Sequence, residues 1–123
     1  MPWGLCIINS EPPLFLEIVQ GQHAFTHNES SAFQLNRKAD ALLLIDAFVE
    51  NCQTHDLDLT DTGEVWVLEE DANPGNYLQY DEGFVSFVDN TSNALQFASS
   101  DMASRYSALL NGDAGALTPF EVV

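Results

Sequence analysis

Carboxylates are the side chains with which this sequence could do most chemistry. It holds 19 aspartates and glutamates against 3 lysines and arginines, which gives a formal net charge of −16. Carboxylates can work in pairs as acid and base, ligate calcium, or meet cationic groups of another protein. Ten of them fall between residues 56 and 89, where no lysine or arginine lies: Asp56, Asp58, Asp61, Glu64, Glu69, Glu70, Asp71, Asp81, Glu82 and Asp89.

One short motif is typical of a catalytic carboxylate. Asp61-Thr62-Gly63 matches the triplet of aspartic proteases, in which two such aspartates share a proton. The flanking Thr60 and Glu64 argue against that family. We therefore interpret the triplet as a turn before a strand, and we expect the protein not to be an enzyme.

Metal-ligand patterns are weak. The alternating acids of Asp56–Asp61 could touch calcium, but the sixth position of an EF-hand loop is Asp61 instead of glycine, and the twelfth is Val67 instead of glutamate. His23 and His27 fall in a predicted strand and would stand about 13 Å apart along it, too far for one zinc ion. We expect no metal and no cofactor.

The two cysteines lie in apolar surroundings. Cys6 follows Leu5 and precedes two isoleucines, and Cys52 follows an apolar stretch. No CxxC spacing occurs, so a metal pair is disfavoured. We predict two buried free thiols, as is usual in a reducing compartment.

The charge balance limits the partners. Only Arg37, Lys38 and Arg105 are basic, so no basic stripe for nucleic acid can form, and an anionic membrane surface would repel the chain. No apolar run reaches the roughly 18 residues of a membrane span. The first residues lack a basic signal-peptide region. We expect a soluble, cytoplasmic protein whose partner is a basic protein surface.

An internal repeat organises the chain. Residues 14–48 and 76–110, compared without gaps, share 8 identities over 35 positions. The identical pairs include Gly21 with Gly83, Phe25 with Phe87, and Asn28 with Asn90. A repeat of this size predicts two copies of one supersecondary unit.

Each copy is predicted to contain three short strands, a helix and a closing strand. In the first copy, the strands are 3–9, 14–19 and 23–27, broken by a proline pair and by a turn at Gly21. In the second copy, they are 65–69, 77–80 and 84–88, with a hairpin loop at 81–83. The strand at 64–69 would close the first copy and open the second.

Two amphipathic helices follow from apolar residues at i, i+3, i+4 and i+7. They are predicted over 38–52 and 99–110, the second capped by Ser99 or Ser100 and ended by Asn111-Gly112. Residues 54–63 are predicted to be an acidic loop without a counterpart in the repeat, and 118–123 to be the last strand.

These elements predict an α+β protein with antiparallel sheets. It would consist of two tandem β-β-β-α units, residues 1–63 and 64–123, which share a strand within one compact domain. The units would form either one continuous sheet or two small sheets with a helix on each. Asn28 and Asn90 begin matching sequons, which we interpret as structural turns or caps. Most aromatic residues are predicted to be core, with Tyr80 as an example of an exposed contact anchor beside the acids.

In its size, acidity and repeated strand–helix module, the sequence resembles the small anti-defence proteins of phages and mobile elements. Leu16, Gly21 and Phe25 and their partners Leu78, Gly83 and Phe87 carry that module. Some of these proteins inhibit CRISPR or restriction systems as DNA mimics. Duplex DNA carries one charge per about 1.7 Å, so this net charge matches about 27 Å of duplex.

The resemblance implies a decoy that occupies the nucleic-acid groove of a CRISPR–Cas effector, with the ten acids between 56 and 89 as the contact. Three alternatives use the same charge differently. The chain could be a toxin-immunity protein for a basic nuclease, a small structural or assembly protein, or a protein with a salt-adapted surface, although its acid content is low for that adaptation.

Overall fold

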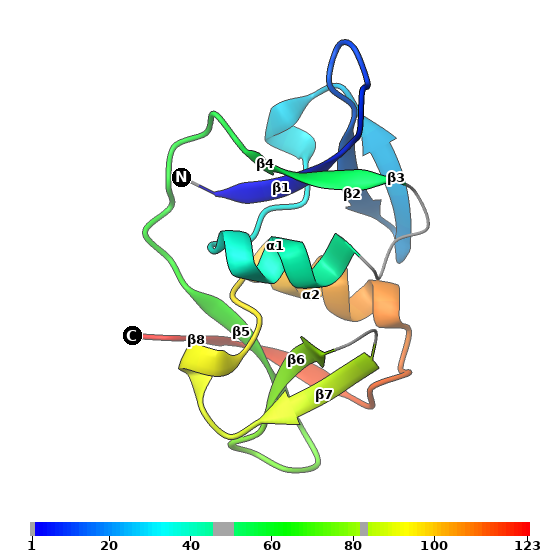
Figure 1. The fold of residues 1–123 in the computed structure, drawn as a ribbon. Coiled ribbons are helices and arrows are strands. Elements are labelled where there is room, and N and C mark those ends of the chain that lie inside the picture. The colour runs from blue at the N-terminus through cyan, green and yellow to red at the C-terminus, as the bar shows by residue number, and fades with distance from the viewer. Residues whose placement is uncertain (1, 46–50, 82–83) are drawn as a thin grey trace.

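Two antiparallel sheets enclose the helices of this chain. The computed structural model describes residues 2–45, 51–81 and 84–123. In that part of the chain, eight strands form two four-stranded sheets, and helices α1 (Lys38–Leu44) and α2 (Ser100–Leu110) lie between them (Figure 1). The predicted α+β class, with two repeated β-rich units and one helix in each, is confirmed.

The first sheet has the order β3-β2-β1-β4. Its strands are β1 (Trp3–Ile7), β2 (Phe15–Val19), β3 (Gln22–Thr26) and β4 (Cys52–Asp56). The turn between β2 and β3 needs glycine at Gly21, because φ is +75° there and an added Cβ would lie 3.2 Å from the Ala108 carbonyl oxygen. The predicted turn at this position is confirmed.

The second sheet repeats this arrangement as β7-β6-β5-β8. Its strands are β5 (Trp66–Glu70), β6 (Tyr77–Asp81), β7 (Phe84–Val88) and β8 (Leu117–Glu121). The predicted caps are also present. The Asn28 and Asn90 side chains accept backbone N–H groups at the starts of two short 3-10 helices, Glu29–Ser31 and Thr91–Asn93. Ser99 caps α2 by accepting from the Met102 N–H.

The helix predicted over 38–52 is shorter than expected. The helix α1 ends at Leu44, residues 46–50 lie outside the described part of the chain, and Cys52 begins strand β4. The prediction of a loop from residue 54 was therefore wrong at its start. Cys52–Asp56 has weak strand character by itself, but β1 pairs with it along its whole length. Tertiary pairing thus overrides a local preference.

The strand predicted to be shared serves only one sheet. In the described chain, β5 pairs with β6 and β8, both in the second half. The first sheet is closed by β4, which is the counterpart of β8. The shared-strand prediction was wrong because the strand at Cys52–Asp56 was missed, which left residues 64–69 as the apparent closing strand.

Two equivalent residues join the sheets instead. Leu35 bridges β1 at Trp3, Phe97 bridges β5 at Trp66, and Leu35 and Phe97 bridge each other in antiparallel pairing. Leu35 and Phe97 occupy the same place in the repeat. An antiparallel bridge between equivalent residues places a local two-fold axis at this junction.

The main core lies between the sheets and draws on both repeats. Phe33, Phe97 and Tyr106 form its centre, with ring centroids 5.6–6.0 Å apart. Leu16 from the first half and its repeat partner Leu78 from the second are fully buried in the same cluster. Burial raises the pKa of the Tyr106 phenol.

Candidate functional site

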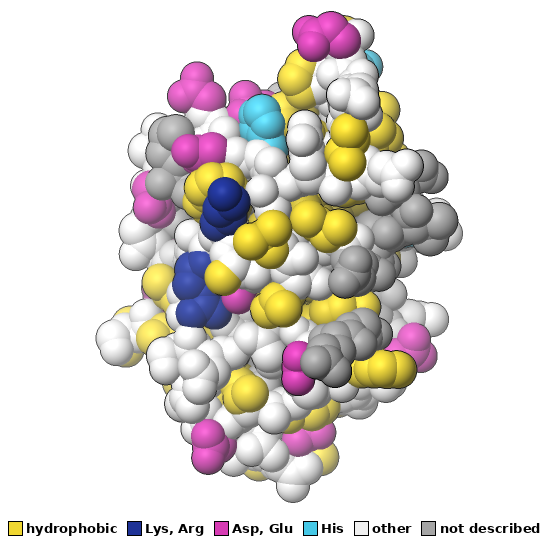
Figure 2. Space-filling model, viewed as in Figure 1, with side chains coloured by type: hydrophobic (Ala, Val, Ile, Leu, Met, Phe, Trp, Pro, Cys, Tyr) yellow, Lys and Arg dark blue, Asp and Glu magenta, His cyan; other side chains and the backbone are white. Residues whose placement is uncertain are grey.

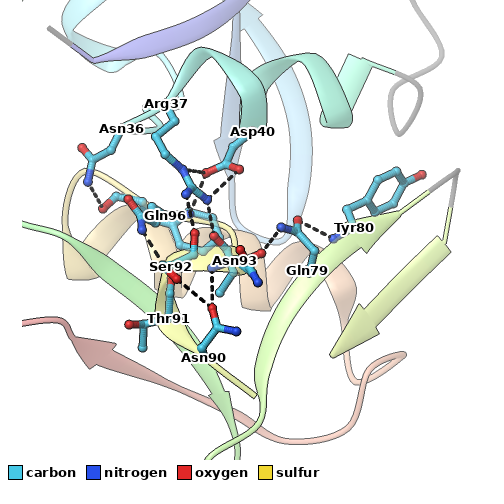
Figure 3. A network of polar contacts seen from close by, with 12 residues as sticks. Asn36, Arg37, Asp40, Gln79, Tyr80, Asn90, Thr91, Ser92, Asn93 and Gln96 are labelled. Carbon is cyan, nitrogen blue, oxygen red and sulfur yellow. Dashed lines mark hydrogen bonds and ion pairs between the residues drawn. The ribbon is translucent and has the colours of Figure 1, made fainter. Parts of the chain in front are cut away.

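Arg37 is committed to the contact between the two repeats. Its guanidinium donates to both Asp40 carboxylate oxygens at 3.0 Å, and to the carbonyl oxygens of Ser92 and Ala94 at 2.6 and 2.5 Å (Figure 3). Asp40 also accepts the Gln96 N–H at 3.0 Å. Burial raises the pKa of Asp40 above its ordinary value, although the Arg37 hydrogen bond opposes this effect.

The other two basic residues are also engaged within the chain. Arg105 on α2 donates to Asp101 at 2.9 Å and to the Ile18 carbonyl oxygen at 2.7 Å, so it too connects the two halves. The Lys38 ammonium lies 5.5 Å from the centre of the Trp3 ring. Both arginines of the chain therefore act in its own packing, and the surface carboxylates are left with little compensation.

Four predicted contact residues lie at the end of β4 and in the segment that leads from it to β5. Asp56, Asp58 and Asp61 are exposed, and Glu64 is half-buried. Glu64 accepts the Trp66 indole N–H at 2.8 Å, and Asp61 accepts the N–H of Gly63 at 3.0 Å. This last bond makes Asp61-Thr62-Gly63 a turn before β5, as predicted.

Three more predicted residues stabilise one end of the second sheet. Glu69 accepts the Gly75 N–H at 3.1 Å, Glu70 accepts the Asn73 amide at 3.0 Å, and the Asp71 carboxylate accepts the Thr118 hydroxyl at 2.6 Å. These bonds hold the β5–β6 turn and the start of β8.

The remaining predicted residues flank β7. Asp81 pairs with Phe84 at the start of β7, and Asp89 follows Val88 at its end; both carboxylates are exposed. Glu82 lies outside the described residues. The nine predicted acids within the described residues therefore occupy separate places: the 56–64 segment, one end of the second sheet, and the two ends of β7. Figure 2 likewise shows carboxylates spread around the outline of one face, with lysine and arginine side chains gathered near the start of α1.

Aromatic side chains lie on the outer face of the second sheet, away from the helices. Strand alternation places Leu78 and Tyr80 toward the core and Tyr77 outward. Tyr77 packs against Phe120 with ring centroids 5.7 Å apart, and Phe84 on the same face is 75% exposed. Tyr80 is only 9% exposed, so the prediction that it is a surface anchor was wrong.

Carboxylates and aromatic rings alternate on this outer face. Glu69 pairs across the strands with Tyr77, and Asp81 pairs with Phe84. Directly opposed residues on one face of a sheet have Cβ atoms about 5 Å apart. We call this surface the acidic–aromatic face, and we define it as Glu69, Tyr77, Asp81, Phe84 and Phe120.

The corresponding face of the first sheet is covered. Leu57, which follows β4, packs over Cys6 and Phe15 in a second small core, and all three are buried. Cys6 lies 3.9 Å from Nδ1 of His55, and it is 3% exposed. A thiol and an imidazole can form a nucleophile and base, but this thiol is closed to a substrate carbonyl. Cys6 and Cys52 are both buried and not joined by a disulfide, as predicted.

The other features of the described residues give weaker support for a functional site. Within residues 2–45, 51–81 and 84–123, no three histidine, cysteine or carboxylate side chains are grouped as metal ligands. An open depression between the β2–β3 turn and the end of α2 is lined mainly by glycines, glutamines and Asn111. None of the helices in the described chain has the length and apolar character needed to cross a membrane.

Comparison of the chain with protein-family models, curated proteins and solved structures finds no match.

Proposed function

We propose that this protein is a non-catalytic inhibitor that binds the cationic surface with which another protein holds nucleic acid. Bound there, it would block access of DNA or RNA. The observation that carries the proposal is the acidic–aromatic face, in which carboxylates alternate with exposed rings on the face of the second sheet that no described helix covers.

The chemistry of this face supports a cationic partner. A lysine or arginine side chain can be neutralised by Asp81 or Glu69 while its stem or its charge rests on the neighbouring ring. Aromatic anchors next to charged groups are typical of binding hot spots. The net charge of −16 adds long-range attraction, which speeds the encounter with a basic surface.

The internal use of both arginines supports the same proposal. Because Arg37 and Arg105 bond to carbonyl oxygens across the repeats and pair with Asp40 and Asp101, they are not available to the carboxylates of the acidic–aromatic face. A surface whose acidity served only solubility would ordinarily mix the two signs of charge.

The partner class is a nucleic-acid-binding protein. The resemblance in size and charge favours a CRISPR–Cas effector in the host cytoplasm, and a basic nuclease neutralised by an immunity protein is the second candidate. Both would present a groove shaped for phosphates, so one assay covers both.

Competition with DNA tests the proposed function. We expect the protein to displace a labelled duplex from a CRISPR effector complex or from a basic nuclease, as measured by fluorescence anisotropy. Displacement should weaken by about tenfold or more between roughly 0.1 M and 0.5 M salt, because the Debye length shortens from about 10 Å to under 5 Å. Failure to displace DNA from either class at low salt would contradict the proposal.

A further inference from the structure

The four edge strands of the two sheets differ in their protection. Edges are normally blocked by proline or by charged side chains. Strand β8 contains Pro119, β4 ends with Asp56, and β3 contains His23. Strand β7, Phe84–Val88, contains no proline and no titratable side chain, and in the described chain it pairs only with β6.

The open side of β7 carries backbone groups that have no hydrogen-bond partner among the described residues. The Leu78 carbonyl oxygen accepts the Leu95 N–H at 3.0 Å, so this carbonyl points away from β7. Leu78 and its partner Phe87 are therefore a non-hydrogen-bonded pair, and alternation makes Tyr80 and Val85 another. The N–H and C=O groups of Val85 and Phe87 consequently point outward from the edge.

We infer that β7 is a docking edge for an extended segment of a cationic partner, which adds a strand to the second sheet. Main-chain hydrogen bonds to Val85 and Phe87 would supply affinity, as in other cases of strand addition. The side chains would supply selectivity, because Asp89 follows the end of β7, and the exposed Phe84 at its start lies opposite Asp81 of β6. A strand with apolar residues in alternation and a lysine or arginine at each end fits this edge. The inference rests on the proposed function and names the form of its partner.

Charge excludes a second copy as the favoured occupant. Antiparallel pairing of two β7 strands would bring Asp89 of each copy to the start of β7 in the other, next to the strand that carries Asp81. Two chains of net charge −16 would also repel each other at long range. A cationic strand would be attracted by the same carboxylates that would repel a second copy of this chain.

The test uses a fluorescein-labelled peptide, Arg-Val-Thr-Val-Thr-Val-Lys, and measures its anisotropy with the intact protein. Val85→Pro removes an outward N–H without removing a bond to β6, and proline is compatible with an edge strand. We expect Val85→Pro to weaken peptide binding by about tenfold or more, which corresponds to about 1.4 kcal/mol. A peptide with glutamate at both ends should bind the wild-type protein no better than the cationic peptide binds the Val85→Pro variant.

A matched pair at Ser86 keeps the inference testable if Val85→Pro perturbs the fold. The Ser86 side chain lies on the outer face of the second sheet. Ser86→Lys should therefore weaken binding of the cationic peptide by about tenfold, whereas Ser86→Glu should not weaken this binding. Circular dichroism checks that each variant is folded.

If the wild-type protein does not bind the peptide, or if folded Val85→Pro and Ser86→Lys bind it as well as wild type does, the docking edge is wrong. A dimer of the wild-type chain that Val85→Pro dissociates would also overturn it, in favour of a second copy. Unchanged displacement of DNA by Val85→Pro would leave the proposed function standing while the edge inference fails.

Discussion

Replacing Asp40 by alanine should destabilise the protein by about 3 kcal/mol. The side chain of Asp40 is 2% exposed, and it holds both the Arg37 guanidinium and the Gln96 N–H. Its loss leaves a partly buried cation without its counterion and a backbone donor without its acceptor. The estimate lies at the low end for a buried ion pair because Arg37 keeps its carbonyl contacts and about a third of its surface in water. Urea unfolding measures the change.

Asp101→Ala is the matched control for this effect. Asp101 also pairs with an arginine on a helix, but its side chain is 65% exposed. An exposed pair of this kind, even with the helix dipole, contributes at most about 1 kcal/mol. If Asp40→Ala lowered the free energy of unfolding no more than Asp101→Ala does, the Arg37–Asp40 pair would not be what holds the two repeats together.

Reversing the charges at the two ends of β7 should abolish partner binding. The double variant Asp81→Lys and Asp89→Lys places cations where the proposed partner presents its own. Like charges across an interface cost several kcal/mol, so we expect the affinity for the cationic partner to fall by about 100-fold or more. Both side chains are exposed, so thermal unfolding should be nearly unchanged. The measurement is the DNA displacement assay.

The control for charge alone is Glu11→Lys with Asp113→Lys. Both residues are exposed and lie outside the acidic–aromatic face, and the substitutions change the net charge by the same amount. This control should lose only long-range attraction, a change of about fivefold or less in affinity. Equal losses in the two double variants would mean that total charge, and not this face, determines binding.

The sequence was informative where the same signal occurs in both repeats. Gly21, Asn28 and Asn90 were assigned to turns and caps because only a few residue types satisfy those backbone positions. Cys52–Asp56 was missed because its strand character comes from pairing with β1, which no local pattern contains. The arginine contacts between the repeats join residues about 55 and 87 positions apart. Hydrophobic periodicity is a local pattern, so it cannot predict these contacts either.

The candidate site was only partly predictable for the same reason. Charge counting found the carboxylates but could not tell that Glu69, Glu70 and Asp71 hold a turn and a strand end. The exposed rings were missed, although the alternation in Tyr77–Asp81 already separates Tyr77 from Tyr80. Which of the two faced outward depended on the helices, whose position relative to the sheet only the fold provides.

Hydrogen exchange of the backbone amides, with and without the bound nucleic-acid-binding protein, tests the central claim most directly. The acidic–aromatic face predicts slowed exchange at β7, above all at the outward amides of Val85 and Phe87, and in the residues from Asp89 onward. Slowed exchange confined to α1, where Leu42 and Leu43 are exposed, or to the first sheet, would contradict it.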